Sequence, residues 1–325
     1  MTSIIGNAAA QAELRAALAS PKLHHAWLFA GPEGVGKATL ARATALRLLA
    51  QAADPLLAPD VDIPPQHRIR SLVEAGSHPD FRILQRQPKD PDKPDQDIAR
   101  SIPIAQVRSL APLFATKPSL SHRRVVLIDA IDDVERPGAS NALLKMLEEP
   151  PEGTVFLLIS HAPGRLLPTI RSRCRTLRFE PLANEQVEQV VRAALPEASD
   201  AETRAVVRAG NGSPGRALGF AGLDMASLER DLEAAATGGD PDNAIRTRLA
   251  KALSGKAAQP RYEAFLARVP SFVAAQACDR TGDALVAAID TQAATRELGS
   301  ASIGLTLDPA TTVFQMVGHV ASLAR

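Results

Sequence analysis

Short apolar runs alternate with amphipathic stretches over the first half of the chain. Continuous aliphatic runs are typical of strands buried on both faces of a parallel sheet, and they predict strands over 125–128 and 155–159. Two other short apolar stretches predict strands over 26–30 and 81–84. Apolar positions at helical spacing predict helices over 11–19, 38–51, 104–114 and 140–149. Strands that alternate with helices from residue 26 to about residue 179 predict a doubly wound α/β domain with a parallel sheet.

The pattern changes after Pro181, where the strand signals stop. The predicted elements there are helices over 185–195 and 201–209, a turn over 210–215 and a helix from Arg216 to about Gly222. Residues 224–325 are rich in Ala and Leu, are predicted to be helical and carry no recognisable chemical motif. Proline- and charge-rich stretches over 55–65 and 85–97 predict surface loops or insertions. The predicted fold class is therefore α/β followed by all-α.

The composition narrows the classes of function. The chain has 325 residues, of which 45% are hydrophobic, and this length predicts two or three domains with a sizeable core. Lys and Arg number 37 and Asp and Glu 36, so the formal net charge of +1 argues against a strongly basic nucleic-acid coat. Any contact with DNA is then local or shared with partners. Only 3% of the residues are aromatic, which argues against stacking platforms for single-stranded nucleic acid.

The cysteines and the first residues bear on the compartment. Cys174 and Cys278 lie far apart in the sequence, which excludes a disulfide scaffold and any CxxC-type zinc or redox site. The first residues lack a basic segment followed by an apolar core, and no run of about 18 apolar residues occurs. We therefore expect a cytoplasmic protein without a membrane span.

A glycine-rich loop connects the first predicted strand to the next helix. Residues 31–37, GPEGVGK, match the pattern G-x-x-x-x-G-K. In such a loop the glycines let backbone N–H groups turn inward on phosphates, the helix N-terminus adds a positive dipole, and the lysine reaches the β/γ oxygens. We therefore take Gly31, Gly34, Gly36 and Lys37 as candidate nucleotide-binding residues.

The loop lacks two parts that ATP hydrolysis needs. The position after the lysine, where a Ser or Thr hydroxyl would bind Mg²⁺, is Ala38. Thr39 does not replace it, because one residue along a helix turns the side chain by about 100°. Asp129 directly follows the third predicted strand and could hold Mg²⁺ through water, but the next position, where a Glu would orient the attacking water, is Ala130. These residues predict a nucleotide-binding fold that has lost hydrolysis, and they leave weak binding of ATP or ADP open.

Three runs of residues are similar to a known family. They are His78-Pro79-Asp80, residues 141–151 (NALLKMLEEPP) and residues 170–174 (IRSRC). Through them the chain resembles the delta-prime subunits of bacterial DNA polymerase III clamp loaders, a family within the AAA+ superfamily. The resemblance covers residues 1 to about 222, and residues 224–325 are assigned only because the family ends in a helical domain. The losses at Ala38 and Ala130 point to delta-prime over its ATP-hydrolysing relatives.

The resemblance implies a chain of three parts and a place in an assembly. The parts are a P-loop AAA+ ATPase-like domain over 1–179, a small helical lid over 180–222 and a C-terminal helical oligomerisation (collar) domain over 223–325. The implied partners are gamma/tau-like ATPase subunits and delta, in a complex that opens the sliding clamp and places it on primed DNA. No catalysis by the chain itself is expected. Its link to DNA-directed DNA polymerase III is membership of the holoenzyme, since no residue here could carry nucleotidyl transfer with paired metal-binding carboxylates.

Residues 172–174 (SRC) resemble a motif of the same family, which implies that Arg173 reaches into the ATP site of a neighbouring subunit. A planar guanidinium with a fixed fork of donors suits the charge on a transferring γ-phosphoryl group. The alternative for any arginine is a solvated or locally paired surface charge. We expect that for four neighbours, Arg165, Arg171, Arg175 and Arg178. Cys174 is expected to be a small buried residue and not a nucleophile.

Weaker expectations concern sensor, capping and metal residues. Ser160 follows the fourth predicted strand at the family's polar sensor position, with a simple turn residue as the alternative. Arg216 lies one position away from the lid arginine that senses γ-phosphate in active relatives, so it is sensor-like or only a helix-start charge. Asp132 and Asp133 are expected to cap or solvate a turn. Many family members carry a four-cysteine zinc module, but residues 51–78 contain no cysteine, so no zinc is predicted.

Two other functions remain open at this point. The first is a competent ATP-hydrolysing AAA+ motor subunit of the same type of loader, which would act through Lys37 and Asp129. ATP turnover by the isolated chain would establish it. The second is a free-standing DNA-binding module, which the near-zero net charge disfavours and which steeply salt-dependent binding to primed DNA would revive.

Overall fold

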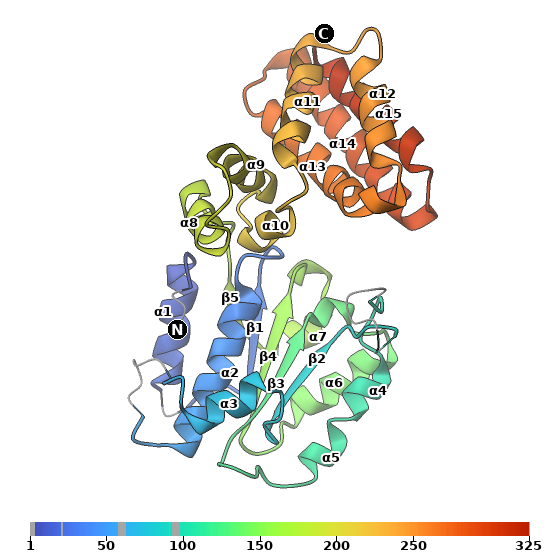
Figure 1. Cartoon of the computed structure of the whole chain (residues 1–325). Helices are drawn as coiled ribbons and strands as arrows, with labels where there is room; N and C mark the ends of the chain where they lie inside the picture. The colour runs from blue at the N-terminus through green and yellow to red at the C-terminus, as the bar shows by residue number, and fades with distance from the viewer. Residues whose placement is uncertain (1–3, 21, 58–62, 91, 93–97, 325) are drawn as a thin grey trace. The chain divides into compact units, whose positions relative to one another are not determined.

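A computed structural model describes residues 4–20, 22–57, 63–90, 92 and 98–324. The chain divides into two compact units, Met1–Leu182 and Ala183–Arg325 (Figure 1). The predicted loops over 55–65 and 85–97 lie partly outside the described residues. The first unit contains a parallel sheet and the second is helical, as the fold class predicted.

A five-stranded sheet forms the centre of the first unit. Its strands are β1 (Ala26–Ala30), β2 (Phe81–Gln85), β3 (Arg124–Asp129), β4 (Thr154–Ser160) and β5 (Arg175–Arg178). They lie in the order β2-β3-β4-β1-β5, and every neighbouring pair is parallel. The four predicted strands are confirmed. The pattern of apolar runs missed β5, because only Leu177 of its residues is buried.

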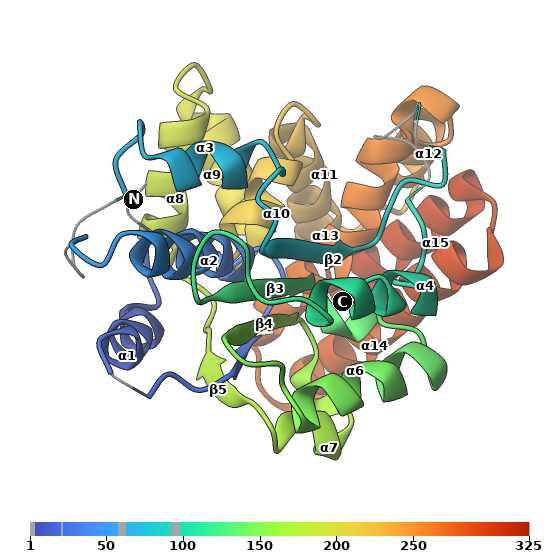
Figure 2. The ribbon, with the colours of Figure 1, turned by 90° about the horizontal axis from the view of Figure 1, so that it is seen from below.

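Helices cover both faces of this sheet (Figures 1 and 2). The bounds are α1 (Ala8–Leu18), α2 (Lys37–Ala53), α3 (Arg68–Glu74), α4 (Ile104–Arg108), α5 (Ala111–Phe114), α6 (Gly138–Glu148) and α7 (Pro168–Arg171). Helices α2 and α3 lie on one face, and α4 and α6 lie on the other. Short 3₁₀ turns over Ile131–Asp133 and Pro163–Arg165 follow β3 and β4.

The core lies between the strands and the helices. Strands β1 and β4 are buried along their whole length, which explains their continuous apolar sequence. Alternate residues such as Leu28, Val126 and Phe156 face the layer of α4 and α6, where they join Leu143 and Leu147 in one cluster. Each such side chain contributes about 1.5–3 kcal/mol by leaving water. This burial holds the helices on the sheet.

The helix predicted over 104–114 is two helices in the structure. Helix α4 ends at Arg108 and α5 begins at Ala111, with Ser109 and Leu110 between them. The physical reason is Pro112, which has no backbone N–H to donate to the carbonyl four residues earlier and whose ring crowds that carbonyl. Helix α3 was not predicted, because the loop signals on its N-terminal side masked a short amphipathic stretch.

The second unit consists of helices. They are α8 (Asn184–Ala194), α9 (Asp200–Gly210), α10 (Pro214–Gly219), α11 (Met225–Gly238), α12 (Ala244–Leu253), α13 (Gln259–Ala277), α14 (Gly282–Leu305) and α15 (Pro309–Ala321). A buried ion pair joins α13 to α11, where the Nη2 atom of Arg268 lies 2.9 Å from Glu229. The finer division into a lid over 180–222 and a collar over 223–325 stays a prediction. Within the described part of the chain, no helix has both the length and the apolar character that crossing a bilayer requires.

Gly31 offers a test of how closely β1 and the segment after β5 approach. A Cβ atom at Gly31 would lie 2.2 Å from the carbonyl oxygen of Phe179. The N–H of Phe179 donates to the carbonyl of Ala30, so the backbone there is already tied to the end of β1. We expect Gly31→Ala to lower the free energy of unfolding by about 2 kcal/mol, measured by urea denaturation. Gly164→Ala is the matched control, because a Cβ there meets no atom within 4 Å. Equal stability of the two variants would contradict the close approach.

Candidate functional site

The phosphate loop lies at the carboxyl edge of the sheet, between β1 and α2. The N–H of Gly31 donates to the carbonyl of Ser160 at 3.2 Å, which ties the start of the loop to the end of β4. Gly36 has a φ of 98°, a conformation that side chains disfavour, and it caps α2. The strand–loop–helix context predicted for residues 31–37 is therefore present.

Lys37 is turned onto its own loop. It is the first residue of α2 and only 2% exposed. Its Nζ atom donates to the carbonyl oxygen of Gly31 at 2.6 Å and also to that of Pro32. Burial lowers the pKa of this ammonium to about 8, although the nearby carboxylates act to raise it. The group that would bind phosphate is thus engaged by backbone carbonyls.

The acidic partner of the loop is also engaged within the chain. Asp129 ends β3, and its carboxylate lies 3.8 Å from the guanidinium of Arg42 on α2. Ala130, which follows it, is 2% exposed and has no proton acceptor. Thr39 is exposed and lines a cavity between α2, α3 and β2, on the side of α2 that faces α3. Position 38 therefore provides no hydroxyl to bind Mg²⁺, and position 130 provides no base to orient water.

Ser160 is held by a side chain that the sequence did not connect with it. The serine is fully buried at the end of β4, and its Oγ donates to Asp132 at 3.0 Å. Asp132 also accepts from the N–H groups of His161 at 2.7 Å and Ala162 at 3.2 Å. Asp132 therefore caps the chain after β4, across the sheet edge, and not a turn of its own segment. A sensor role for Ser160 remains a prediction, with its hydroxyl already donating to Asp132.

Arg173 stands between α7 and β5, and it differs from the arginines around it. Its guanidinium is one third exposed and lies 2.7 Å from a carboxylate oxygen of Glu148, the last residue of α6. A second nitrogen donates to the carbonyl of Thr169 at 2.8 Å. Four neighbours are more exposed, namely Arg165, Arg171, Arg175 and Arg178, and of these Arg175 pairs with Glu13 at 3.1 Å. The structure thus gives Arg173 a defined orientation while leaving it reachable.

Cys174 is partly buried where the sequence predicted a buried residue. It packs against the core cluster beneath α6 and α7. Burial raises the pKa of its thiol to about 12, so the thiol stays protonated near neutral pH. A protonated thiol is a poor nucleophile, which agrees with a packing role.

Two further expectations lie away from the loop. Arg216 is exposed in α10, in the second unit, where its own N–H donates to the cap residue Ser213. Its assignment as a sensor stays a prediction. Over the described ranges, the His, Cys, Asp and Glu side chains form no group of three or more that could hold a metal ion.

Comparison with known proteins identifies the family. A family model described as DNA polymerase III, delta subunit, matches residues 6–183, more than half of the chain. A relative from Pseudomonas aeruginosa is 39% identical over 191 residues and one from Bacillus subtilis is 36% identical over 169 residues, and both are named DNA polymerase III subunit delta'. The chain belongs to the delta-prime family of DNA polymerase III subunits. The resemblance found in the sequence is confirmed.

The delta-prime match concerns part of the chain. The two alignments cover 58% and 51% of this chain and 53% and 45% of the relatives, so the chain spans about half the length of the curated relatives it matches. A gamma/tau subunit of Mycobacterium tuberculosis (strain H37Rv) is 30% identical over 215 residues, which are 65% of this chain and 34% of that protein. The family match ends at residue 183, where the second unit begins. The family assignment therefore rests on the first unit.

A solved structure gives a more distant likeness. The gamma subunit-related protein of Thermotoga maritima is aligned over 97% of this chain and 99% of its own, at 15% identity and a TM-score of 0.47.

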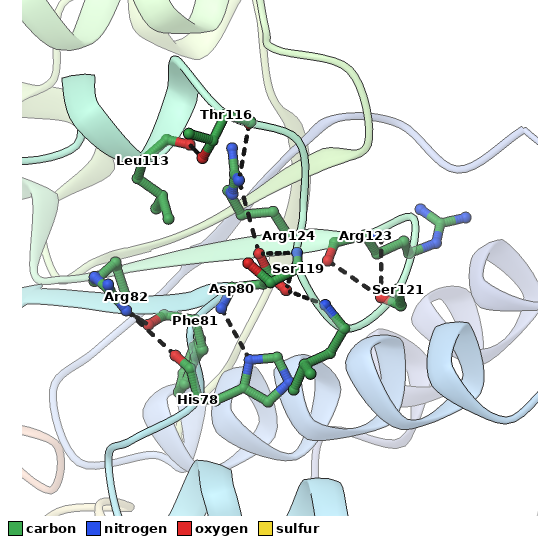
Figure 3. Close-up of polar contacts among 11 residues, drawn as sticks. His78, Asp80, Phe81, Arg82, Leu113, Thr116, Ser119, Ser121, Arg123 and Arg124 are labelled. Atoms are coloured by element: carbon green, nitrogen blue, oxygen red, sulfur yellow. Dashed lines mark hydrogen bonds and ion pairs between the residues drawn. The ribbon is translucent and has the colours of Figure 1, made fainter.

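The His-Pro-Asp run of this delta-prime chain has a structural role (Figure 3). Asp80 is fully buried and its carboxylate accepts from the N–H groups of Ser119, at 2.8 and 2.9 Å, and of Leu120, at 3.0 Å. Arg124 at the start of β3 lies 3.7 Å from the same carboxylate. Burial lowers the pKa of His78, so its ring is neutral and its Nδ1 atom accepts from the N–H of Asp80 at 3.1 Å. The run therefore fastens the 115–123 loop to the amino-terminal edge of the sheet, opposite the phosphate loop.

Loss of the Asp80 carboxylate is expected to destabilise the first unit strongly. Asp80→Ala would leave the Arg124 guanidinium buried without its charged partner, with only the carbonyl of Thr116 still accepting from it, which costs about 3–5 kcal/mol in the free energy of unfolding. Urea denaturation measures this change. Glu152→Ala is the control at the same edge, since Glu152 is exposed, and it should change stability by less than about 0.5 kcal/mol. Similar losses in both variants would show that the buried pair has no special role.

Lys37 should titrate near pH 8 in the folded chain, below the ordinary lysine value of 10.5. The unfolded chain then binds more protons between these two values, so the free energy of unfolding should rise with pH across that window. NMR of labelled lysine ammonium groups measures the pKa of Lys37. Urea unfolding at several pH values measures how the free energy of unfolding depends on pH. The rise should be shallower in Lys37→Met. A Lys37 signal that titrates together with the surface lysines would contradict the burial of its ammonium group.

Proposed function

We propose that this chain is a non-hydrolysing clamp-loader subunit that supplies Arg173 to the ATP site of a neighbouring ATPase subunit. In this role it helps to load a sliding clamp onto primed DNA during replication. The family assignment supports the general role, since the relatives are named as delta-prime and gamma/tau subunits of DNA polymerase III. The geometry of the site supports the finer part of the proposal, that this chain does not hydrolyse ATP and supplies Arg173 to a neighbour.

One contrast carries the proposal. The chain holds Arg173 at its surface in a defined orientation, while its own phosphate loop has Lys37 donating to loop carbonyls and an alanine at both position 38 and position 130. A chain that hydrolysed its own ATP would need a Mg²⁺ ligand and a group to orient water. An arginine that acts on a neighbour needs only to be reachable and placed. An arginine that acts in this way, called an arginine finger, raises the rate of ATP hydrolysis about 10³–10⁵-fold. This corresponds to lowering the activation free energy by roughly 4–7 kcal/mol.

The competing function, a motor subunit that hydrolyses ATP itself, would act through Lys37 and Asp129. Both side chains are already engaged, Lys37 by carbonyls and Asp129 by Arg42. A nucleotide would have to displace the first contact, and a metal would have to compete with the second. Weak binding of ATP or ADP stays compatible with this site, but efficient hydrolysis does not.

The second unit supports a collar role in the assembly. Helix α14 packs inward through small or polar residues, namely Ala288, Thr291, Thr295, Gly299 and Ser302. It leaves large apolar side chains in water, including Val286, Ile289, Ile303 and Leu305. Val286 and Ile289 lie near the start of α14, and Ile303 and Leu305 lie at its end. We propose that these exposed side chains contact other loader subunits of the gamma/tau and delta type, because burial against a partner would remove them from water.

The remaining parts of the proposal follow from the role. We assign contact with primed DNA and with the sliding clamp to the complex as a whole, and the net charge of +1 agrees with a DNA contact that is local or shared with partners. A subunit of a bacterial replication complex works in the cytoplasm, without a membrane, and the chain needs no zinc for this role. It takes part in DNA polymerase III as a component of the holoenzyme and carries no reaction of its own.

We expect Arg173→Ala to lower ATP hydrolysis at the neighbouring site at least about tenfold in the reconstituted loader, because the γ-phosphoryl charge loses its donor. The assay is clamp- and primer-stimulated ATP hydrolysis, after gel filtration has shown that wild type and variant assemble equally. Arg171→Ala is the matched control, since Arg171 is exposed and its side chain makes a long hydrogen bond, of 3.5 Å, to the carbonyl of Pro163.

Two results would overturn the proposal. Equal rates for wild type and Arg173→Ala would reduce the chain to a scaffold. ATP turnover by the isolated chain with Mg²⁺ would instead favour the motor subunit.

A further inference from the structure

The carboxylate that contacts Arg173 comes from a rigid part of the fold. Glu148 is the last residue of α6, one position after Leu147, which is 1% exposed in the core. The carbonyl of Leu147 lies 3.1 Å from the Nε2 atom of His25, at the entrance to β1. Leu143, one turn earlier in α6, is fully buried. The base of the Glu148 side chain is therefore fixed to the sheet.

Two short contacts, and a longer one of 3.5 Å to the hydroxyl of Ser172, orient the guanidinium of Arg173. Its Nη2 atom lies 2.7 Å from Glu148, and its Nη1 atom donates to the carbonyl of Thr169 at 2.8 Å. Hydrogen bonds to a charged acceptor are short and directional, so the pair restricts rotation of the planar group. Arginine has five N–H donors, which leaves others to meet an anion.

The ion pair between Arg173 and Glu148 is too exposed to contribute much to the free energy of unfolding. The side chain of Arg173 is 33% exposed and that of Glu148 46% exposed. Pairs in such surroundings contribute little to stability, because water screens them. Their effect lies in orientation, since a long arginine side chain that is already held loses less freedom when it engages a partner.

The neighbouring carboxylate provides a comparison within the same helix end. Glu149 caps α6 and is exposed, and the described part of the chain gives it no ion pair. One step along the chain thus separates a carboxylate that holds the arginine from one that does not. The sequence run EEPP does not distinguish the two.

We propose that Glu148 is a positioning residue, whose carboxylate holds the Arg173 guanidinium in the orientation in which it meets the phosphoryl group of the neighbouring subunit. This inference rests on the proposed function of Arg173. The C-terminal end of α6 then orients Arg173 in addition to packing against the core. It also predicts that removal of Glu148 acts only through Arg173.

The test uses the reconstituted loader with this chain as wild type, Glu148→Ala, Glu148→Gln, Glu149→Ala, Arg173→Ala and the double variant Glu148→Ala/Arg173→Ala. We expect Glu148→Ala to lower kcat for ATP about threefold to tenfold, the range that freeing one long side chain implies. KM for ATP should stay unchanged, because the arginine is withdrawn from the transferring group and not from nucleotide binding. Glu149→Ala should match wild type.

The double variant separates positioning from a general structural effect. If Glu148 acts through Arg173, then Glu148→Ala adds nothing once Arg173 is alanine. A purely structural defect would lower the rate further in that background. Glu148→Gln keeps the size of the side chain and an acceptor, so it should fall between wild type and Glu148→Ala and gives the same test if the alanine variant does not assemble.

A second readout does not depend on ATP. In the isolated full chain, NMR relaxation of the Arg173 Nε–H group should show increased motion in Glu148→Ala and not in Glu149→Ala. Unchanged motion would overturn the proposal, as would an unchanged or faster rate for Glu148→Ala in the loader. If Arg173→Ala itself leaves hydrolysis unchanged, the proposed function fails. If Arg173→Ala lowers it and Glu148→Ala matches Glu149→Ala, the positioning role alone fails.

Discussion

The all-parallel order of the five strands is the constraint on which the site depends. In a parallel sheet every strand ends at the same edge, so the segments after β1, β3 and β4 meet there. Ala30 pairs with Ser160, and Asp129 pairs with Ile159. The phosphate loop, the acidic strand end and the polar strand end are therefore neighbours because of backbone pairing alone. The buried apolar faces of β1, β3 and β4 hold that edge in place.

The polar groups at this edge satisfy one another within the chain. Lys37 donates to loop carbonyls, Asp129 lies beside Arg42, and Asp132 accepts from Ser160 and the residues after it. Buried polar groups that lack partners are costly, so pairing them within the chain stabilises the fold at this edge. At the opposite edge, Asp80 and Arg124 do the same for the loop that precedes β3.

Arg173 differs from these groups, because its side chain is held in one orientation and is still partly exposed to solvent. Its partners are the Glu148 carboxylate, the Thr169 carbonyl and, at 3.5 Å, the Ser172 hydroxyl, and a third of its side chain reaches solvent. In the other unit, α14 similarly directs its small residues inward and leaves large apolar ones outside. Arg173 and the exposed apolar residues of α14 are the groups that the proposed function assigns to contacts with other subunits.

The sequence by itself determined the local elements and the family. Continuous apolar runs predicted β1, β3 and β4, the glycine spacing predicted the loop before α2, and the run NALLKMLEEPP carried the resemblance, because each signal is complete within a few neighbouring residues. Local patterns failed where a signal was weak, as in β5 and α3, or where Pro112 divided a helix. Only the tertiary structure decided that Lys37 binds its own loop, that Asp132 caps β4 and that Glu148 rather than Glu149 holds Arg173. These pairings depend on which strand ends and helix ends meet in space, and that is set by packing across the sheet rather than by spacing along the chain.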